Sequence, residues 1–210
     1  MELTSVLASG ESPPESGLQR RIAAAQSSTE PAPKFEDVYE AYVDFVWRMV
    51  CRFGLRQQAA EDVVQEVFLA VHRRLPEFEG RSSVKTWLVG IIRFALLERR
   101  RSMRHKALDR APAPEVSPDL DALEDATTEG PHERAAHAEA LRLLYELLDG
   151  LDEDKREVFV LVELEQMPVV EAAAALGVNV NTVYSRLRLA REKFDAALAR
   201  HHARDGWRSR

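Results

Sequence analysis

Residues 168–194 read PVVEAAAALGVNVNTVYSRLRLAREKF, and this stretch decides the fold of the C-terminal part of the chain. Its alanine-rich beginning, residues 170–176, predicts a short helix that ends at Gly177, the residue type best suited to close a helix. A second helix is expected to begin near Asn179. Two helices joined by a turn of about three or four residues that contains glycine form a helix-turn-helix, whose second helix enters the DNA major groove by its N-terminal end. The stretch therefore predicts DNA binding.

The second helix divides into an apolar face and a polar face. We expect Val178, Val183 and Leu187 to pack against the rest of the domain. Polar and basic side chains crowd the other side just after the turn and are the candidate DNA contacts: Asn181, Thr182, Tyr184, Ser185, Arg186 and Arg188. An ordinary antiparallel helical hairpin in a bundle is the alternative interpretation. The crowding of polar and basic residues on one helix favours DNA binding over that alternative.

The length and the composition restrict the class of protein. A chain of 210 residues and 23.8 kDa holds one large domain or two small ones, and a hydrophobic content of 45% supports folded cores. The single cysteine, Cys51, excludes an internal disulfide, and no cysteine–histidine spacing is typical of a zinc site. No apolar run approaches the roughly 20 residues of a membrane span, and no secretory signal is recognisable. We therefore expect a soluble, cytoplasmic protein without metal or cofactor.

The net charge of −6 is distributed in a way that permits nucleic-acid binding. Residues 35–106 hold 13 basic against 10 acidic side chains, and residues 178–210 hold 8 against 3. Residues 107–139, by contrast, hold 2 basic against 9 acidic side chains. The local field steers a protein toward phosphate more than the total charge does, so the acidic total does not exclude DNA.

The sequence predicts an all-α chain of two small helical domains joined by an acidic flexible linker. Apolar residues recur at the spacing of amphipathic helices in residues 35–53, 59–75, 84–104, 133–148 and 152–164. Pro76 is expected to end the second of these helices, and Ser82 or Ser83 to cap the third. The resulting division is a disordered extension at 1–34, a first domain at 35–106, the linker at 107–132, a second domain at 133–200 and a basic tail at 201–210.

Three features of the first domain each have an ordinary structural explanation as well as a functional one. Residues 61–66 form a polar helix face, which taken alone is more often a solvated surface. The loop at 78–83 leads into a helix with Lys85, Thr86 and Trp87, a combination that holds unpaired bases, although Trp87 alone is more often a core residue. The arginines at 93, 99–101 and 104 suit DNA phosphates, or simply the end of a helix.

The order of these features is more specific than any one of them. Residues 59–101, AAEDVVQEVFLAVHRRLPEFEGRSSVKTWLVGIIRFALLERRR, are followed by the helix-turn-helix. This combination resembles the bacterial RNA polymerase sigma factors of the extracytoplasmic-function class, in the sigma-70 family. The resemblance covers residues 35–106, which correspond to sigma region 2, and residues 133–200, which correspond to region 4. It implies a protein that binds core RNA polymerase, directs promoter-specific transcription initiation and performs no catalysis itself.

The resemblance also implies a role for particular residues. The acidic helix of the family docks on core polymerase, which assigns that contact to Asp62, Gln65, Glu66 and Phe68. The family captures a flipped base of the minus-ten element in the loop before the tryptophan helix, which assigns this element to Phe78, Glu79, Gly80, Arg81, Ser82, Ser83, Lys85, Trp87 and Arg93. The helix-turn-helix reads the minus-thirty-five element, with Asn181, Thr182, Tyr184, Ser185, Arg186, Arg188 and Arg191. The linker resembles the segment that passes through the RNA exit channel, and an anti-sigma protein is an expected partner.

Two residues depart from the family pattern, and other classes of function remain as alternatives. Phe94 stands where the family often has asparagine, and Leu189 where a basic residue is frequent, so the promoter sequence stays open. A stand-alone helix-turn-helix regulator is the main alternative, but it gives the loop at 78–83 no purpose. A protein that sequesters polymerase would explain the acidic helix and not the recognition helix. No catalytic triad or phosphate-binding glycine loop supports an enzyme.

Overall fold

The structure, a computed structural model, describes residues 33–107 and 131–208, and every regular element in these two ranges is a helix. The expected all-α fold is therefore confirmed. The predictions of a disordered extension at 1–34 and of a flexible acidic linker at 107–132 fall almost wholly outside the described residues.

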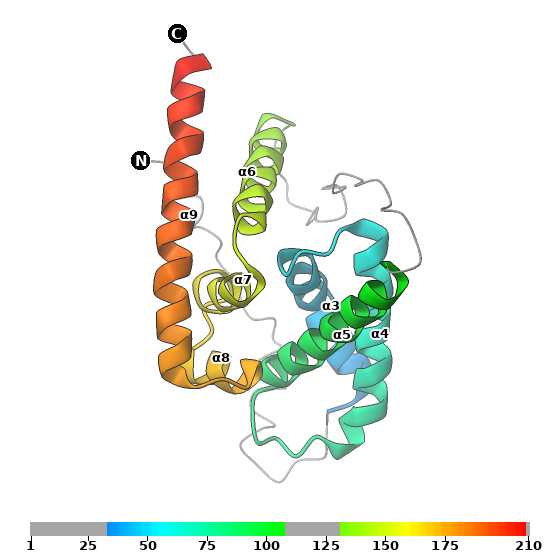
Figure 1. The fold of residues 1–210 in the computed structure, drawn as a ribbon. Coiled ribbons are helices and arrows are strands. Elements are labelled where there is room, and N and C mark those ends of the chain that lie inside the picture. Colours follow the sequence, from blue (N-terminus) through cyan, green and yellow to red (C-terminus); the bar gives the residue numbers. More distant parts are fainter. Residues whose placement is uncertain (1–32, 108–130, 209–210) are drawn as a thin grey trace.

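The N-terminal domain is a bundle of three helices that pack against one another (Figure 1). Its elements are α3 (Phe35–Arg52), α4 (Gln57–Arg74), the short 3₁₀ turn η1 (Leu75–Glu77) and α5 (Val84–Ala107). Val46, Val63 and Leu88, one from each helix, are fully buried at the centre. The apolar spacing in the sequence thus marks the faces that meet, as expected for amphipathic helices.

The C-terminal domain contains the predicted helix-turn-helix. Its elements are α6 (Pro131–Asp149), α7 (Glu153–Phe159), the π-helical turn η3 (Val160–Leu164), α8 (Val169–Leu176) and α9 (Val180–Arg208). Phe159 and Phe194 stack at 4.6 Å between ring centroids and join α7 to α9. Val183 and Leu187 are buried as predicted, and Val178 packs against the core.

The turn between α8 and α9 depends on two residues. Gly177 has φ 63° and ψ 34°, a left-handed conformation that glycine adopts without a steric cost. The next amide, of Val178, then donates to the carbonyl of Ala173 and closes α8. The side-chain oxygen of Asn179 accepts a hydrogen bond of 2.8 Å from the amide of Asn181 and caps α9. Both residues belong to the stretch that predicted the motif.

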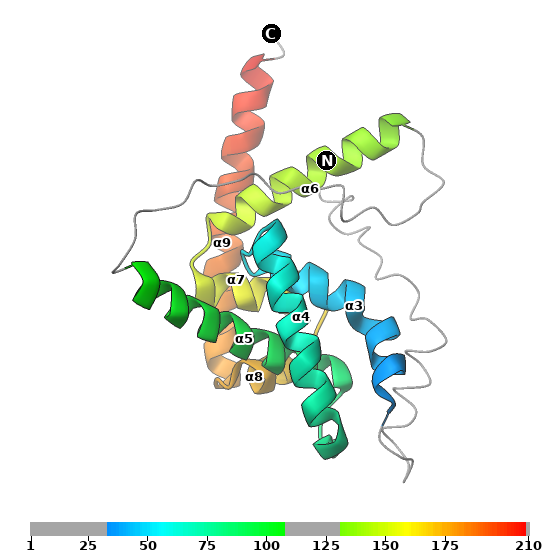
Figure 2. The same cartoon turned by 90° about the vertical axis from the view of Figure 1, so that its right-hand side faces the viewer.

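Two helix ends differ from the expected boundaries. Helix α6 begins at Pro131, inside the expected linker, since proline is well tolerated in the first turn of a helix. Helix α9 continues to Arg208 through residues expected to form a tail, and it reaches beyond the rest of the molecule in both views (Figures 1 and 2). Proline is absent between the turn and Arg208, so no residue stops the helix sooner.

The two domains lie against each other rather than apart. Helix α8 packs on the first turns of α5, and Figure 2 shows α5 crossing in front of the C-terminal helices. The buried hydrophobic residues of both domains form one continuous cluster. A helical sequence pattern indicates which face of a helix is buried but not which partner covers it, so this packing could not be predicted.

Candidate nucleic-acid and polymerase interfaces

Ser83 sets the start of α5 and thereby the position of the side chains on its first turn. The Ser83 hydroxyl accepts a hydrogen bond of 3.1 Å from the amide of Thr86, so Ser83 rather than Ser82 is the cap. Gly80, in the loop before it, has φ +67°, and an added Cβ there would meet no atom within 4 Å. Glycine is therefore required at position 80 by the backbone conformation and not by lack of space.

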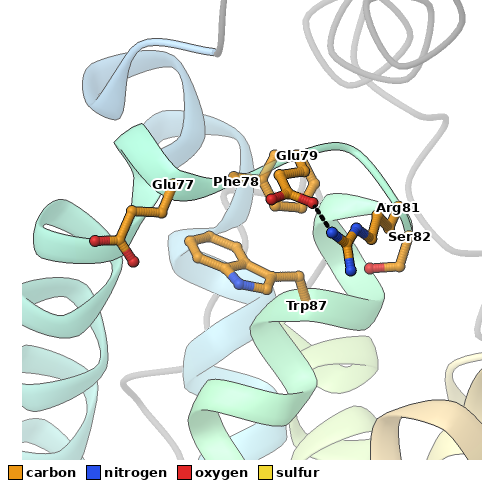
Figure 3. A pocket seen from close by; sticks show the side chains of 6 residues that line it. All are labelled: Glu77, Phe78, Glu79, Arg81, Ser82 and Trp87. Atoms are coloured by element: carbon orange, nitrogen blue, oxygen red, sulfur yellow. Dashed lines mark ion pairs between the residues drawn. The ribbon is translucent and has the colours of Figure 1, made fainter.

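An open hollow lies between the loop and α5 (Figure 3). It has a volume of about 310 Å³ and is lined by Glu77, Phe78, Glu79, Arg81, Ser82 and Trp87. The rings of Phe78 and Trp87 lie 5.0 Å apart and tilt by 47°, and both remain partly exposed. Arg81 pairs with Glu79 at the rim, with 84% of its side chain exposed. Partly exposed aromatic rings beside a cation can stack on a planar ring such as a nucleic-acid base.

Three other residues of the predicted minus-ten set, Ser83, Lys85 and Arg93, face the C-terminal domain. The ammonium of Lys85 lies 3.4 Å from a carboxylate oxygen of Glu165, and Nε of Arg93 donates to Glu157 at 3.1 Å. Burial raises the pKa of the Glu157 carboxyl above its ordinary value, and the Arg93 guanidinium opposes that rise. The structure thus places five of the nine predicted residues at the hollow and three at the domain interface, while Gly80 belongs to neither group.

Phe94 is a surface aromatic residue that the site prediction left out. It is 54% exposed, and the guanidinium carbon of Arg74 lies 5.8 Å from the centre of its ring. Phe94 stands seven residues after Trp87 on α5, a spacing of about two turns that places both on one side of the helix. The sequence already showed that Phe94 departs from the family pattern, and this departure could have identified Phe94 as a candidate site residue.

The predicted polymerase contacts on α4 divide into exposed and buried side chains. Asp62, Gln65 and Glu66 are exposed, and Asp62 pairs with Arg99 at 3.3 Å. Phe68 is only 6% exposed, and its ring meets that of Tyr39 at 4.7 Å. Its neighbour Leu69 is 55% exposed, so Leu69 and not Phe68 presents the apolar surface beside the acidic face. Helical spacing already places Leu69 on the polar side, four residues after Gln65 and seven after Asp62. The sequence analysis missed it because the assignment of Phe68 came from the family resemblance and not from the spacing.

Most of the predicted minus-thirty-five residues lie on the outer face of α9. Asn181, Tyr184, Ser185, Arg188 and Arg191 are exposed, whereas Thr182 and Arg186 are half-buried. Two of the arginines are held by carboxylates of the same domain: Arg186 contacts Asp154 at 2.6 Å, and Arg191 contacts Glu163 at 2.9 Å. Arg188 pairs along its own helix with Glu192 at 2.6 Å. Arg188 therefore differs from Arg186 and Arg191, because its carboxylate partner lies on α9 itself and not on another element.

Other kinds of site find little support in the described residues. In 33–107 and 131–208, no three histidine, cysteine or acidic side chains gather in a way that would hold a metal ion. None of the helices described is both long and apolar enough to cross a bilayer. Burial raises the pKa of the Cys51 thiol to about 11, which makes it a packing residue rather than a nucleophile.

Each of the two domains matches the model of a known protein family. The model "Sigma-70 region 2" matches residues 38–106, nearly all of α3 to α5. The model "Sigma-70, region 4" matches residues 141–194, which include α8, the turn and the first half of α9.

Individual proteins show the same relationship. The probable RNA polymerase sigma-C factor of Mycobacterium bovis is 32% identical over 158 residues, which cover 73% of this chain and 76% of that protein. The ECF RNA polymerase sigma factor SigE of Mycolicibacterium smegmatis is 29% identical over 80% of this chain, and the match spans 63% of SigE. Among solved structures, the sigma factor RpoE of Bartonella quintana, in complex with the anti-sigma factor NepR, has the same fold with a TM-score of 0.64 and 21% identity, over 79% of this chain and 96% of that one.

Proposed function

This chain belongs to the sigma-70 family of RNA polymerase sigma factors, in the ECF class, and we propose that its two described domains hold a promoter at two separate points. Directing transcription initiation from promoters is the function of this family. The main support for the proposal is that the same chain has an aromatic hollow in its region 2 domain and a recognition helix in its region 4 domain. The hollow takes an unpaired base, and the helix reads duplex DNA.

The hollow between Phe78 and Trp87 is proposed as the place where promoter melting is stabilised. A flipped base that stacks there recovers part of the unstacking cost, which is a few kcal/mol per base. Stacking on an aromatic side chain contributes about 1–3 kcal/mol per base. The group of Phe78, Glu79, Arg81 and Ser82 forms the rim and the wall of the hollow. Phe94 lies on the same side of α5, with Arg74 of α4 near its ring, and offers a second ring to the unpaired strand.

The outer face of α9 is proposed to read the minus-thirty-five element. Asn181 and Arg188 are exposed on the N-terminal half of the helix, the half that enters the major groove in a helix-turn-helix. Asparagine pairs with adenine and arginine with guanine through two hydrogen bonds each. Tyr184, at 57% exposure, adds an aromatic side chain to the same face.

The acidic face of α4 is proposed as the contact with core polymerase. Asp62, Gln65 and Glu66 supply polar groups, and Leu69 with Tyr39 supplies an apolar surface next to them. An interface of this kind, with an apolar centre and a polar rim, is typical of stable protein complexes. The buried ring of Phe68 packs against the ring of Tyr39.

The partners and the location follow from the same proposal. The chain works with core RNA polymerase in the cytoplasm, it binds promoter DNA in double- and single-stranded form, and the polymerase performs the chemistry. We propose that an anti-sigma protein holds it inactive; RpoE, a protein of the same fold, forms a complex with the anti-sigma factor NepR.

Run-off transcription with purified core RNA polymerase tests the function. Transcription starts mapped after overproduction of the full chain supply the candidate promoters. The sigma proposal expects transcripts that depend on both the chain and the core enzyme. If the chain binds these sites tightly without polymerase and starts no transcript with it, the stand-alone regulator is the better interpretation.

A further inference from the structure

The part of the chain that carries the recognition helix is acidic as a whole. Residues 141–194, which match sigma region 4, hold 7 basic and 10 acidic side chains, a balance of −3. Domains that bind DNA usually present an excess of basic side chains, because attraction to phosphate supplies nearly all of their sequence-independent affinity. This domain therefore has no net positive charge with which to hold DNA of any sequence.

Every basic side chain in residues 180–194, the first half of α9, is paired with a carboxylate. The four pairs, with distances between 2.5 and 3.2 Å, are Arg186–Asp154, Arg188–Glu192, Arg191–Glu163 and Lys193–Asp152. Three of the four carboxylates belong to α7, to its cap or to η3, and not to α9 itself. These three carboxylates thus lie along the side of the recognition helix that faces α7 and η3.

The two arginines held by other elements are fixed by direct hydrogen bonds. One carboxylate oxygen of Glu163 accepts from Nε of Arg191 at 2.9 Å and from its Nη2 at 2.5 Å. Nη2 of Arg186 donates to Asp154 at 2.6 Å, and only 24% of the Arg186 side chain is exposed. A guanidinium binds carboxylate and phosphate oxygens through the same N–H groups. Each carboxylate therefore competes with a DNA phosphate for its arginine.

These two pairs are not needed to hold α7 and α9 together. The side chains of Asp154 and Glu163 are 55% and 30% exposed, and ion pairs that reach the solvent contribute little to folding stability. The two helices are joined instead by apolar packing, such as the stacked rings of Phe159 and Phe194. A role in DNA binding therefore explains the two carboxylates better than a role in folding.

We propose that Asp154 and Glu163 are specificity-determining residues, which limit the sequence-independent affinity of the recognition helix by neutralising Arg186 and Arg191. Contacts to phosphate carry no sequence information, whereas contacts to base edges do. With these two cations neutralised, base contacts such as that proposed for Asn181 decide where the helix binds. The inference rests on the proposed reading of the minus-thirty-five element by α9.

The effect on specificity follows from the freedom of the helix on random DNA. In the cognate complex, base contacts fix the register of α9, so its cations have no choice of phosphate. On random DNA, the helix settles wherever its free cations find phosphates. Freeing Arg186 and Arg191 should therefore strengthen binding to random DNA more than binding to the cognate site.

The test removes the two negative charges and leaves the arginines in place. Asp154→Asn combined with Glu163→Gln changes the shape of the side chains little. The matched control combines Glu139→Gln with Glu146→Gln, two exposed residues of α6. Both double variants change the net charge equally, so a general attraction to DNA affects them alike. A third variant, Asp154→Glu with Glu163→Asp, keeps both charges and separates the effect of charge from that of shape.

Two measurements are made. Fluorescence anisotropy gives the affinity of the full chain for a random duplex of two helical turns, roughly 20 base pairs, over a range of salt concentrations. We expect the neutralised variant to bind at least about threefold more tightly than the control, with a salt dependence steeper by about 1–2, since each phosphate contact contributes about 0.9 to that slope. Competition between cognate and random duplexes for the holoenzyme should show a ratio of affinities at least about threefold lower. The charge-retaining variant should behave as the unchanged protein does.

The proposal is overturned if the neutralised variant and the control bind random duplex with the same affinity and salt dependence, or if the ratio of affinities is unchanged. Circular dichroism melting establishes that each variant is folded. If the double variant does not fold, Glu163→Gln alone is measured, and an unchanged salt dependence in that variant also overturns the proposal. Binding to random duplex does not depend on transcription. A variant that gains this binding, in a chain that starts no transcript with core polymerase, contradicts the proposed sigma function and not the role of the two carboxylates.

Discussion

At the scale of single residues, Trp87 carries the proposal for promoter melting. Trp87→Ala removes the ring that faces Phe78 across the hollow. We expect the open complex to lose about 1–3 kcal/mol, the contribution of one stacked base, while binding to duplex promoter DNA changes little. Permanganate footprinting of unpaired thymines measures the melting. Trp87→Phe should recover part of the loss. If Trp87→Ala melts the promoter as well as the unchanged protein does, the hollow takes no part in melting.

The arginines of the recognition helix allow a second prediction at this scale. Arg188→Ala should weaken binding to the cognate site by about 1–3 kcal/mol and leave binding to random DNA nearly unchanged, as expected for a base contact. Arg186 is tied to Asp154, so we expect Arg186→Ala to affect both kinds of DNA by a smaller and equal factor. Competition binding of the holoenzyme to specific and random duplexes separates the two. The reverse order of effects would assign the base contact to Arg186.

The thiol of Cys51 gives a prediction on pH. Burial raises its pKa from 9.0 to about 11, so the folded protein holds the proton more tightly than the unfolded chain does. The stabilising contribution of the neutral thiol is complete below pH 9.0 and is lost as the pH rises toward about 11. At pH 9.0, we expect iodoacetamide to alkylate Cys51 slowly in buffer and rapidly in urea. A cysteine introduced on the surface by Glu146→Cys should react at once in both, and equal rates in buffer would contradict the burial of Cys51.

At the scale of elements, the turn of the helix-turn-helix depends on the conformation of Gly177. Gly177→Ala places a Cβ on a residue with φ +63° and should lower the free energy of unfolding by about 1–2 kcal/mol. Gly90→Ala is the matched change within α5, where an added Cβ meets no atom within 4 Å. It should raise stability by about 0.5–1 kcal/mol, because alanine is the better helix former. Urea denaturation compares the two, and effects of the same sign would contradict the assigned turn.

The same comparison shows what local sequence determines about an element. Gly177 and Asn179 appear as turn residues in the sequence and have those roles in the structure, since helix ends depend on neighbouring backbone groups. Helical spacing likewise puts Leu69 on the same side as Asp62 and Gln65, and Phe68 on the apolar side of α4. Only the packing of α3 on α4 shows that the residue covering Phe68 is Tyr39.

At the scale of the whole molecule, the contact between the domains should contribute to stability. Arg52→Ala leaves the Glu165 carboxylate, 5% exposed, without its guanidinium partner. We expect the free energy of unfolding to fall by about 1–3 kcal/mol, the cost of a buried group that loses a hydrogen bond. Arg142→Ala breaks an exposed pair on α6 and should cost less than about 0.5 kcal/mol. Equal effects in urea denaturation would mean that the domains are not joined in solution.

Sequence alone determined the helical class, the helix-turn-helix and the order of features that identified the family, because these depend on spacing along the chain and on neighbouring residues. It also indicated the residues around the hollow, which come from one loop and the helix that follows it. Only the tertiary structure decided that Ser83, Lys85 and Arg93 face carboxylates of a distant segment. Arg93 and Glu157 are 64 positions apart. Pairing of that kind is determined by how whole helices pack, and no local pattern in the sequence records it.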